Sequence, residues 1–71
     1  MRKLLLHKSI YNEQSINAAR EAFLGIASIS INTINDYYLC SFSDCSADET
    51  LTMKEFENYL IDLVNAHNEH N

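Results

Sequence analysis

Oxygen-bearing side chains recur at alternate positions after residue 43, in a spacing that could bind a calcium ion. In the calcium loop of EF-hand proteins, positions 1, 3, 5, 7, 9 and 12 supply the ligands. Six residues of this chain fall at those positions: Asp44, Ser46, Asp48, Thr50, Thr52 and Glu55. Position 6 requires glycine for a sharp turn, but here it is Glu49, and strand-like residues precede the loop. The pattern therefore favours an acidic turn, with calcium binding as a weak alternative.

The histidines and cysteines offer little further chemistry. His67 and His70 could share a metal, but no third ligand is placed beside them, so a solvated tail is favoured. His7 is expected to be a structural side chain with no nucleophile paired to it. Cys40 and Cys45 lack the spacing of a zinc or redox site and are expected to be free thiols, Cys40 pointing inward and Cys45 more exposed. With no placed nucleophile, base or cofactor motif, the chain is expected to be neither an enzyme nor a cofactor protein.

Length and charge limit the classes of partner. A chain of 71 residues can form one small domain, 1–71, with a polar tail from about residue 66. Its formal net charge of -5 argues against duplex nucleic acid or an anionic membrane as the main partner, because both bind clustered Lys and Arg. The cations gather in the first half of the chain: Arg2, Lys3, Lys8 and Arg20. The apolar run at residues 4–6 is too short for a signal peptide, so a cytoplasmic location is expected.

The first half of the chain predicts a strand followed by a helix. Residues 3–10 are rich in Leu and Ile, which is typical of a short strand, although their alternation does not show which face is buried. Asn12 is a suitable N-cap for a helix over residues 13–24. Gly25 stands where a left-handed residue would end that helix.

The clearest pattern is a hairpin over residues 27–43. Apolar and polar residues alternate before Asn35 and Asp36, which can form a two-residue turn. Pairing outward from that turn sets Ile31 against Cys40 and Ile29 against Phe42. These four side chains are therefore expected to share one face of the sheet.

A second helix is predicted after the acidic loop. Thr52 and Glu55 have the spacing of a capping box, so the helix is expected to begin at Thr52. An apolar stripe then continues to about His67: Met53, Phe56, Tyr59, Leu60, Leu63 and Val64. Ile61 lies off this stripe, where it is available to a partner.

The resulting order is β-α-β-β-α, an α+β fold. It predicts a three-stranded sheet in the order 2-3-1 with both helices on one face, like a ferredoxin-like fold that lacks its last strand. The outer edge of the first strand is then unpaired, and an open edge can accept a second copy of the chain or an extended peptide.

Several segments resemble the small HxsD-type protein of the His-Xaa-Ser systems. The similarity lies in Ser9-Ile10-Tyr11, in residues 16–19 with Phe23, and in residues 55–62, and it spans nearly the whole chain. The resemblance implies an accessory protein without catalytic residues, encoded beside radical SAM enzymes that modify ribosomally made peptides. Its implied partner is the precursor peptide or the radical SAM maturase.

Together with the open edge, this resemblance predicts a peptide- or enzyme-binding module. The expected contacts come from Lys3, Leu5, His7 and Ser9 on the first strand, and from Ile61 on the second helix. Two other classes stay open: a structural homodimer or antitoxin-like inhibitor, and a calcium-binding module. A homodimer could pair through this same strand edge, and the first strand would then be a structural interface between two copies of the chain.

Overall fold

The computed structural model describes residues 2–68, which form three strands and two helices. In chain order they are β1 (Arg2–His7), α1 (Glu13–Ala22), β2 (Ser28–Ile34), β3 (Tyr37–Ser43) and α2 (Glu49–Asn68). Within residues 2–68, neither helix is both long and apolar enough to cross a membrane.

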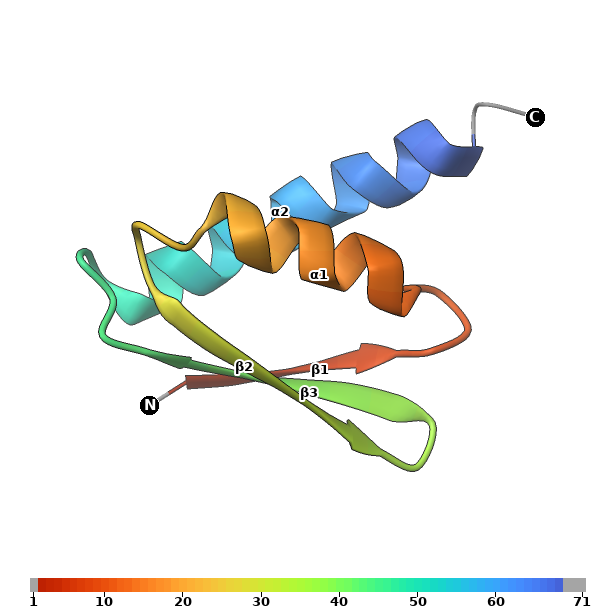
Figure 1. Cartoon of the computed structure of the whole chain (residues 1–71), viewed down its shortest axis with the longest axis horizontal. Helices are drawn as coiled ribbons and strands as arrows, with labels where there is room; N and C mark the ends of the chain where they lie inside the picture. Colours follow the sequence, from red (N-terminus) through yellow and green to blue (C-terminus); the bar gives the residue numbers. More distant parts are fainter. Residues whose placement is uncertain (1, 69–71) are drawn as a thin grey trace.

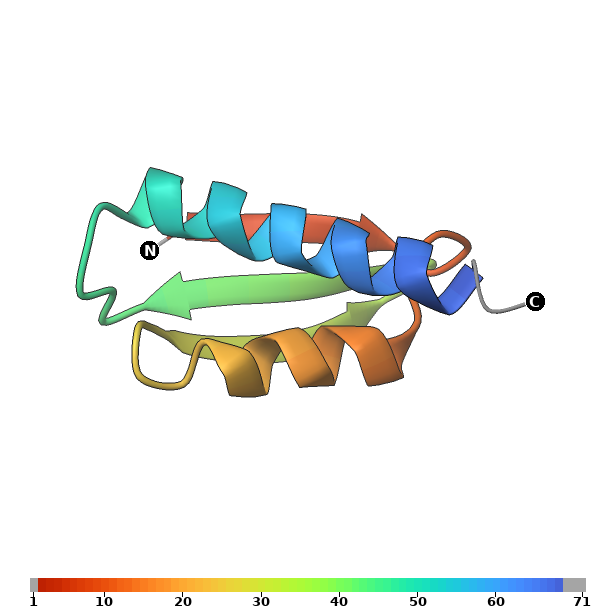
Figure 2. The ribbon, with the colours of Figure 1, turned by 90° about the horizontal axis from the view of Figure 1, so that it is seen from above.

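The strands form one antiparallel sheet in the order β1-β3-β2, with β3 in the centre. Both helices cover the same face of this sheet, so the molecule has two layers (Figure 1). Seen from above, α2 lies on the β1 side and α1 on the β2 side (Figure 2). The predicted α+β fold and strand order are confirmed, and β1 is an edge strand.

β1 is shorter than the predicted strand over residues 3–10. It ends at His7, where the His7 carbonyl oxygen accepts the N–H groups of Ile10 (3.0 Å) and Tyr11 (3.0 Å) and closes a turn. The structure also decides the buried face of this strand. Leu6 is buried and Leu4 is half-buried against the core, whereas Leu5 points to the opposite face.

The start of α1 agrees with prediction and its end does not. Asn12 is the N-cap, and its side-chain oxygen accepts the Ser15 N–H at 2.7 Å. The helix ends at Ala22 rather than residue 24, and Phe23 is its C-cap. Gly25 does not have a positive φ, so the predicted left-handed termination there is wrong. Instead, the Phe23 carbonyl oxygen accepts the N–H groups of Ile26 (2.9 Å) and Ala27 (3.0 Å), which turns the chain toward β2.

The β2-β3 hairpin has the predicted register. Ile29 pairs with Phe42 and Ile31 with Cys40. Asn35 in the turn has a φ of 51°, in the left-handed region that Asn tolerates better than most residues. Because the turn and the alternation require the same register, both strands present the alternating series Ile29, Ile31, Cys40 and Phe42 to the helices.

α2 begins one turn earlier than its predicted capping box. The Asp48 carboxylate accepts the Leu51 N–H at 3.0 Å, and the Asp48 carbonyl oxygen accepts the Thr52 N–H at 2.9 Å. Thr52 therefore lies inside the helix, where it is buried and its hydroxyl donates to the Asp48 carbonyl oxygen at 2.9 Å. The prediction of Thr52 as N-cap is wrong because Asp48 supplies an equivalent oxygen one turn earlier.

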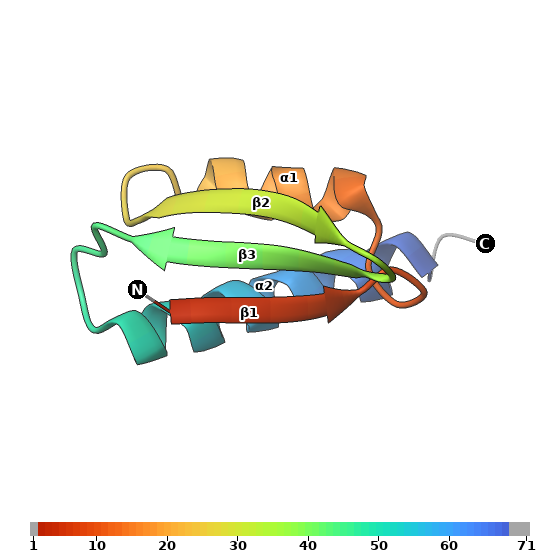
Figure 3. The same ribbon diagram turned by 90° about the horizontal axis from the view of Figure 1, so that it is seen from below.

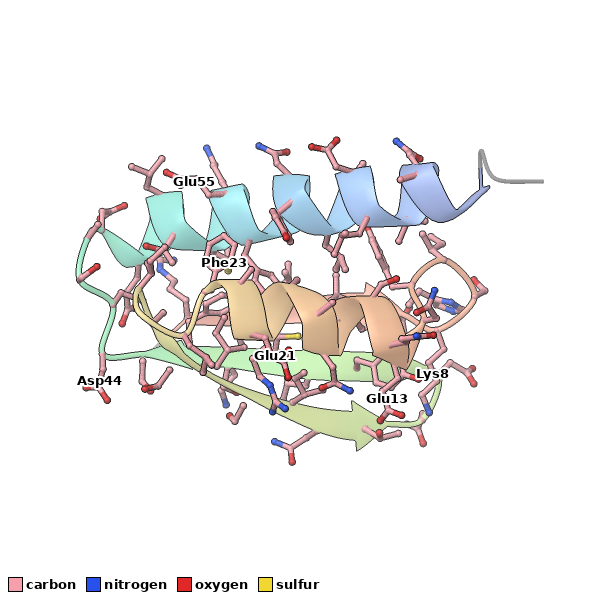
Figure 4. The ribbon with its side chains drawn as sticks, turned by 45° about the horizontal axis from the view of Figure 1, so that its top comes forward. Lys8, Glu13, Glu21, Phe23, Asp44 and Glu55 are labelled. Carbon is pink, nitrogen blue, oxygen red and sulfur yellow. The ribbon has the colours of Figure 1, made fainter. Side chains whose placement is uncertain are left out.

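Three phenylalanine rings join the two helices to the sheet. The Phe56 ring of α2 packs edge-to-face on Phe23 at 5.5 Å and on Phe42 of β3 at 5.2 Å between ring centroids. Figure 4 shows Phe23 between the two helices. Phe56 and Phe42 are fully buried, so this cluster is the centre of the core.

Candidate functional site

The backbone of β1 directs hydrogen-bonding groups away from the sheet. Just beyond the strand, the Lys8 N–H donates to the Asp36 carbonyl oxygen at 2.9 Å, on the β3 side. Backbone groups in an antiparallel ladder point alternately toward and away from the neighbouring strand, so the even-numbered residues of β1 bond to β3. The odd-numbered residues direct their N–H groups to the free edge: Lys3, Leu5 and His7.

The same three side chains lie together on the sheet face that the helices do not cover. They alternate with Leu4 and Leu6, which face the helices. Lys3 is exposed, Leu5 is 57% exposed and His7 is half-buried. Three of the five predicted contact residues are therefore grouped along one edge, although the His7 carbonyl oxygen is already bonded to the turn that follows β1.

Ser9 is not part of this edge. It lies in the turn after β1, where its N–H (3.1 Å) and its hydroxyl (2.7 Å) both lie within hydrogen-bond distance of His7 Nδ1. The expectation that His7 lacks a nucleophile beside it is therefore wrong. Because the Ser9 backbone N–H can only donate, His7 Nδ1 is the acceptor, and the arrangement holds a local turn.

Ile61 lies on the flank of α2 that faces away from α1. Tyr59 marks the α1-facing side, since its ring packs against Phe23 at 5.9 Å between centroids. Two residues along an α-helix correspond to a rotation of about 200°, so Ile61 projects from the opposite side. Its side chain is 39% exposed. α2 lies on the β1 side of the helix layer, so Ile61 belongs to the same side of the molecule as the free edge (Figure 2).

The open face of the sheet carries an apolar surface that the sequence pattern did not predict. Leu5 pairs with Leu39, and Ile34 pairs with Tyr37, with Ile34 44% and Tyr37 40% exposed. The His7 ring packs edge-to-face on Tyr37 at 4.8 Å between centroids. Figure 3 shows this face without a covering element. The odd-numbered residues of β1 would have predicted part of this apolar surface if the sequence had shown which face of the strand is buried.

The six residues of the calcium pattern do not form a calcium loop. α2 begins at Glu49, so Thr52 and Glu55 are helical, and Asp48 is engaged as the helix cap. Asp44 and Ser46 stay in the loop, where the Ser46 N–H donates to the Ile26 carbonyl oxygen. Figure 4 shows Asp44 in the loop after β3 and Glu55 on the far side of α2. Among the described residues, no three His, Cys, Asp or Glu side chains gather to hold a metal ion.

The two cysteines are not part of the free edge of β1. Cys40 is fully buried and Cys45 is half-buried, both as free thiols, as expected. Burial raises the pKa of the Cys40 thiol to about 11, with a smaller opposing effect from the charge of Arg20. The pair His67 and His70 lies outside the residues whose side chains the structure describes.

Comparison with known proteins identifies no relative for this chain. No protein-family model, curated protein or solved structure matches it.

Proposed function

We propose that this protein is a non-catalytic binding module that holds an extended peptide segment by adding it as a strand to the free edge of β1. The segment belongs to a ribosomally made precursor peptide or to the radical SAM maturase that modifies it, as the resemblance to HxsD-type proteins implies. Strand addition supplies affinity through backbone hydrogen bonds and specificity through alternate side chains.

The observation that carries this proposal is the alternation along β1. At Lys3, Leu5 and His7 the backbone N–H groups point to the free edge, and the side chains lie on the uncovered face of the sheet. An incoming strand would bond to these backbone groups and contact these side chains at once. Leu5 alone leaves 57% of its surface available for such a contact.

Charge favours a peptide over a second copy of the chain at this edge. β1 begins with Arg2 and Lys3, is followed by Lys8 and contains no acidic residue. Antiparallel pairing of two β1 strands around Leu5 would place Lys3 of one copy opposite His7 of the other. Such a pair has no opposite-charge contact, whereas facing acidic residues would stabilise the strand pair.

The proposal is tested by amide NMR titration of the labelled protein with the precursor peptide encoded beside its gene. We expect shifts at residues 2–7 and along the adjoining β3, with no change of α1. The substitution Leu5→Pro removes an N–H that faces the free edge and leaves the β1-β3 ladder intact, so it should weaken binding about tenfold or more.

The matched control is Thr33→Pro on the opposite edge. The central strand bonds to its two neighbours through alternate residues, so the Thr33 N–H faces the free edge of β2. This variant should bind like the unmodified protein. Equal weakening by both proline variants, or a tight dimer in which the peptide shifts no resonance, would show that the β1 edge is not the peptide site.

A further inference from the structure

The sheet face that the helices leave uncovered has no acidic side chain. None of the three strands contains an Asp or Glu residue, and Lys3 is the one Lys or Arg that the strands place on this face. Within residues 2–68, every acidic residue lies in a helix, a loop or a turn instead. Figure 4 shows Glu13 and Glu21 on α1 and Glu55 on α2. The negative charge of the chain is therefore kept off the open sheet face.

This open face is divided along the strands into an apolar part and a polar part. Four apolar residues adjoin one another toward the β2-β3 turn and form the open-face patch: Leu5, Ile34, Tyr37 and Leu39. Serine pairs occupy the opposite end, with Ser30 against Ser41 and Ser28 against Ser43. A contiguous exposed apolar patch with a polar surround marks an interaction surface.

The charge and the polar groups both favour a second copy of this chain on the open face. The chain has a formal net charge of -5, so two copies repel each other through their acidic surfaces. This repulsion is reduced at a face whose strands carry no acid. Serine hydroxyls both donate and accept hydrogen bonds, so the polar part can pair with its own copy, as a two-fold symmetric interface requires.

The size of the open face sets the expected strength of such a contact. Strands lie about 4.8 Å apart and rise about 3.4 Å per residue, so three strands of this length present a face of about 14 by 24 Å. Specific interfaces of standard size bury about 800 Å² on each partner, and smaller ones belong to weak complexes. Two copies should therefore exchange between monomer and dimer at micromolar concentrations.

From these observations we infer that the open face of the sheet is the contact surface between two copies of this chain, with the open-face patch of one copy against that of the other. The N–H groups of the β1 edge point within the plane of the sheet, so this contact leaves them free. The dimer thus has two free β1 edges. The inference goes beyond the proposed peptide binding and does not depend on it.

The test measures the mass of the protein by sedimentation equilibrium from about 1 μM to about 1 mM. The mass should rise from that of one chain to that of two. The substitution Leu39→Lys places like charges on both sides of the contact and should raise the dissociation constant about a hundredfold. Ile34→Lys makes the same change on the edge strand β2 and should act in the same direction, and circular dichroism checks that both variants are folded.

Two controls separate this contact from other ways of forming a dimer. Leu24→Lys makes the same change of charge at a residue that is 71% exposed after α1, and it should leave the dissociation constant unchanged. Lys3→Pro removes an N–H from the free edge of β1 and should also preserve the dimer. A monomer at every concentration would overturn the inference. So would a dimer that Lys3→Pro separates and that the folded Leu39→Lys and Ile34→Lys variants retain, because its copies would pair through the β1 edge.

Discussion

At the scale of single residues, the two cysteines have different environments. Cys40 is fully buried on β3 facing the helices, and desolvation of its thiolate raises the pKa to about 11. Cys45 lies in the loop after β3 and is half-buried. Cys40 therefore behaves as a small apolar core residue, and Cys45 is the accessible thiol.

The free energy of unfolding should fall as the pH rises from about 9 to about 11. The pKa of Cys40 in the folded protein lies above the value of 9.0 for an unperturbed thiol, so the folded protein retains a proton that the unfolded chain loses. This contribution is complete below about pH 9 and is lost as the pH approaches 11. Urea denaturation across this range measures it.

The substitution Cys40→Ala provides the comparison. Other groups titrate in the same pH range, but they are common to both proteins. The difference between the two proteins in the slope of unfolding free energy against pH therefore reports on the Cys40 thiol alone. Identical slopes would contradict the prediction. Faster alkylation of Cys40 than of Cys45 at about pH 8 would contradict it independently, because a buried neutral thiol is a poor nucleophile.

At the scale of elements, the start of α2 decides between a capped helix and a calcium loop. Asp48 accepts the Leu51 N–H with its carboxylate and the Thr52 N–H with its carbonyl oxygen. These bonds place Thr52 within the helix and satisfy its buried hydroxyl. The acidic stretch is therefore a helix N-terminus, where negative charge is favourable.

The substitution Asp48→Ala should lower the free energy of unfolding by about 1 kcal/mol, because it removes the oxygen that caps α2. Thermal or urea denaturation measures this loss. Asp44→Asn is the control, since it removes the same charge from an exposed loop position with a φ of 51° that Asn also tolerates.

A larger loss for Asp44→Asn than for Asp48→Ala would contradict the capping assignment. Calcium provides a separate check of the same element. A calcium-dependent shift of the amide resonances of residues 44–55 would restore the calcium-binding module as a function class.

At the scale of the whole molecule, stability depends on contact between the helix layer and the sheet. Phe56 packs on Phe23 and on Phe42, and through them α2 contacts both α1 and β3. A domain of 71 residues has a small core, so few other contacts can compensate for the loss of this one. The helices in turn orient the sheet whose uncovered face and β1 edge form the candidate site.

The substitution Phe56→Ala should cost about 3–5 kcal/mol and unfold most of the protein under ordinary conditions. Phe56→Leu keeps the apolar character and loses the edge-to-face contacts, so it should cost about 1 kcal/mol from those contacts and remain folded. Urea denaturation monitored by circular dichroism measures both.

Ile61→Ala on the same helix is the matched control, because Ile61 is 39% exposed and projects away from α1. It should change the free energy of unfolding by less than about 0.5 kcal/mol. If Ile61→Ala lowered the free energy of unfolding as much as Phe56→Leu, Phe56 would not be the main contact between the helix layer and the sheet.

The sequence by itself determined the features that depend on neighbouring residues. Asn12 caps α1 because its side chain reaches an N–H three residues away. The β2-β3 hairpin has one register because Asn35 permits the turn and the alternation from Ile29 to Phe42 requires the same pairing. The strand order and the edge position of β1 followed from the order of these elements and from the preference for right-handed crossovers.

Only the tertiary structure decided the ends of elements and the sides of β1. Leu4, Leu5 and Leu6 are alike in sequence, and packing against α2 and the core selects which of them is buried. β1 stops at His7 because its carbonyl oxygen bonds to the following turn, which removes Ser9 from the edge. Local patterns specify which pairings are possible, but burial depends on contacts between residues distant in the chain, and these form only when the helix layer packs on the sheet.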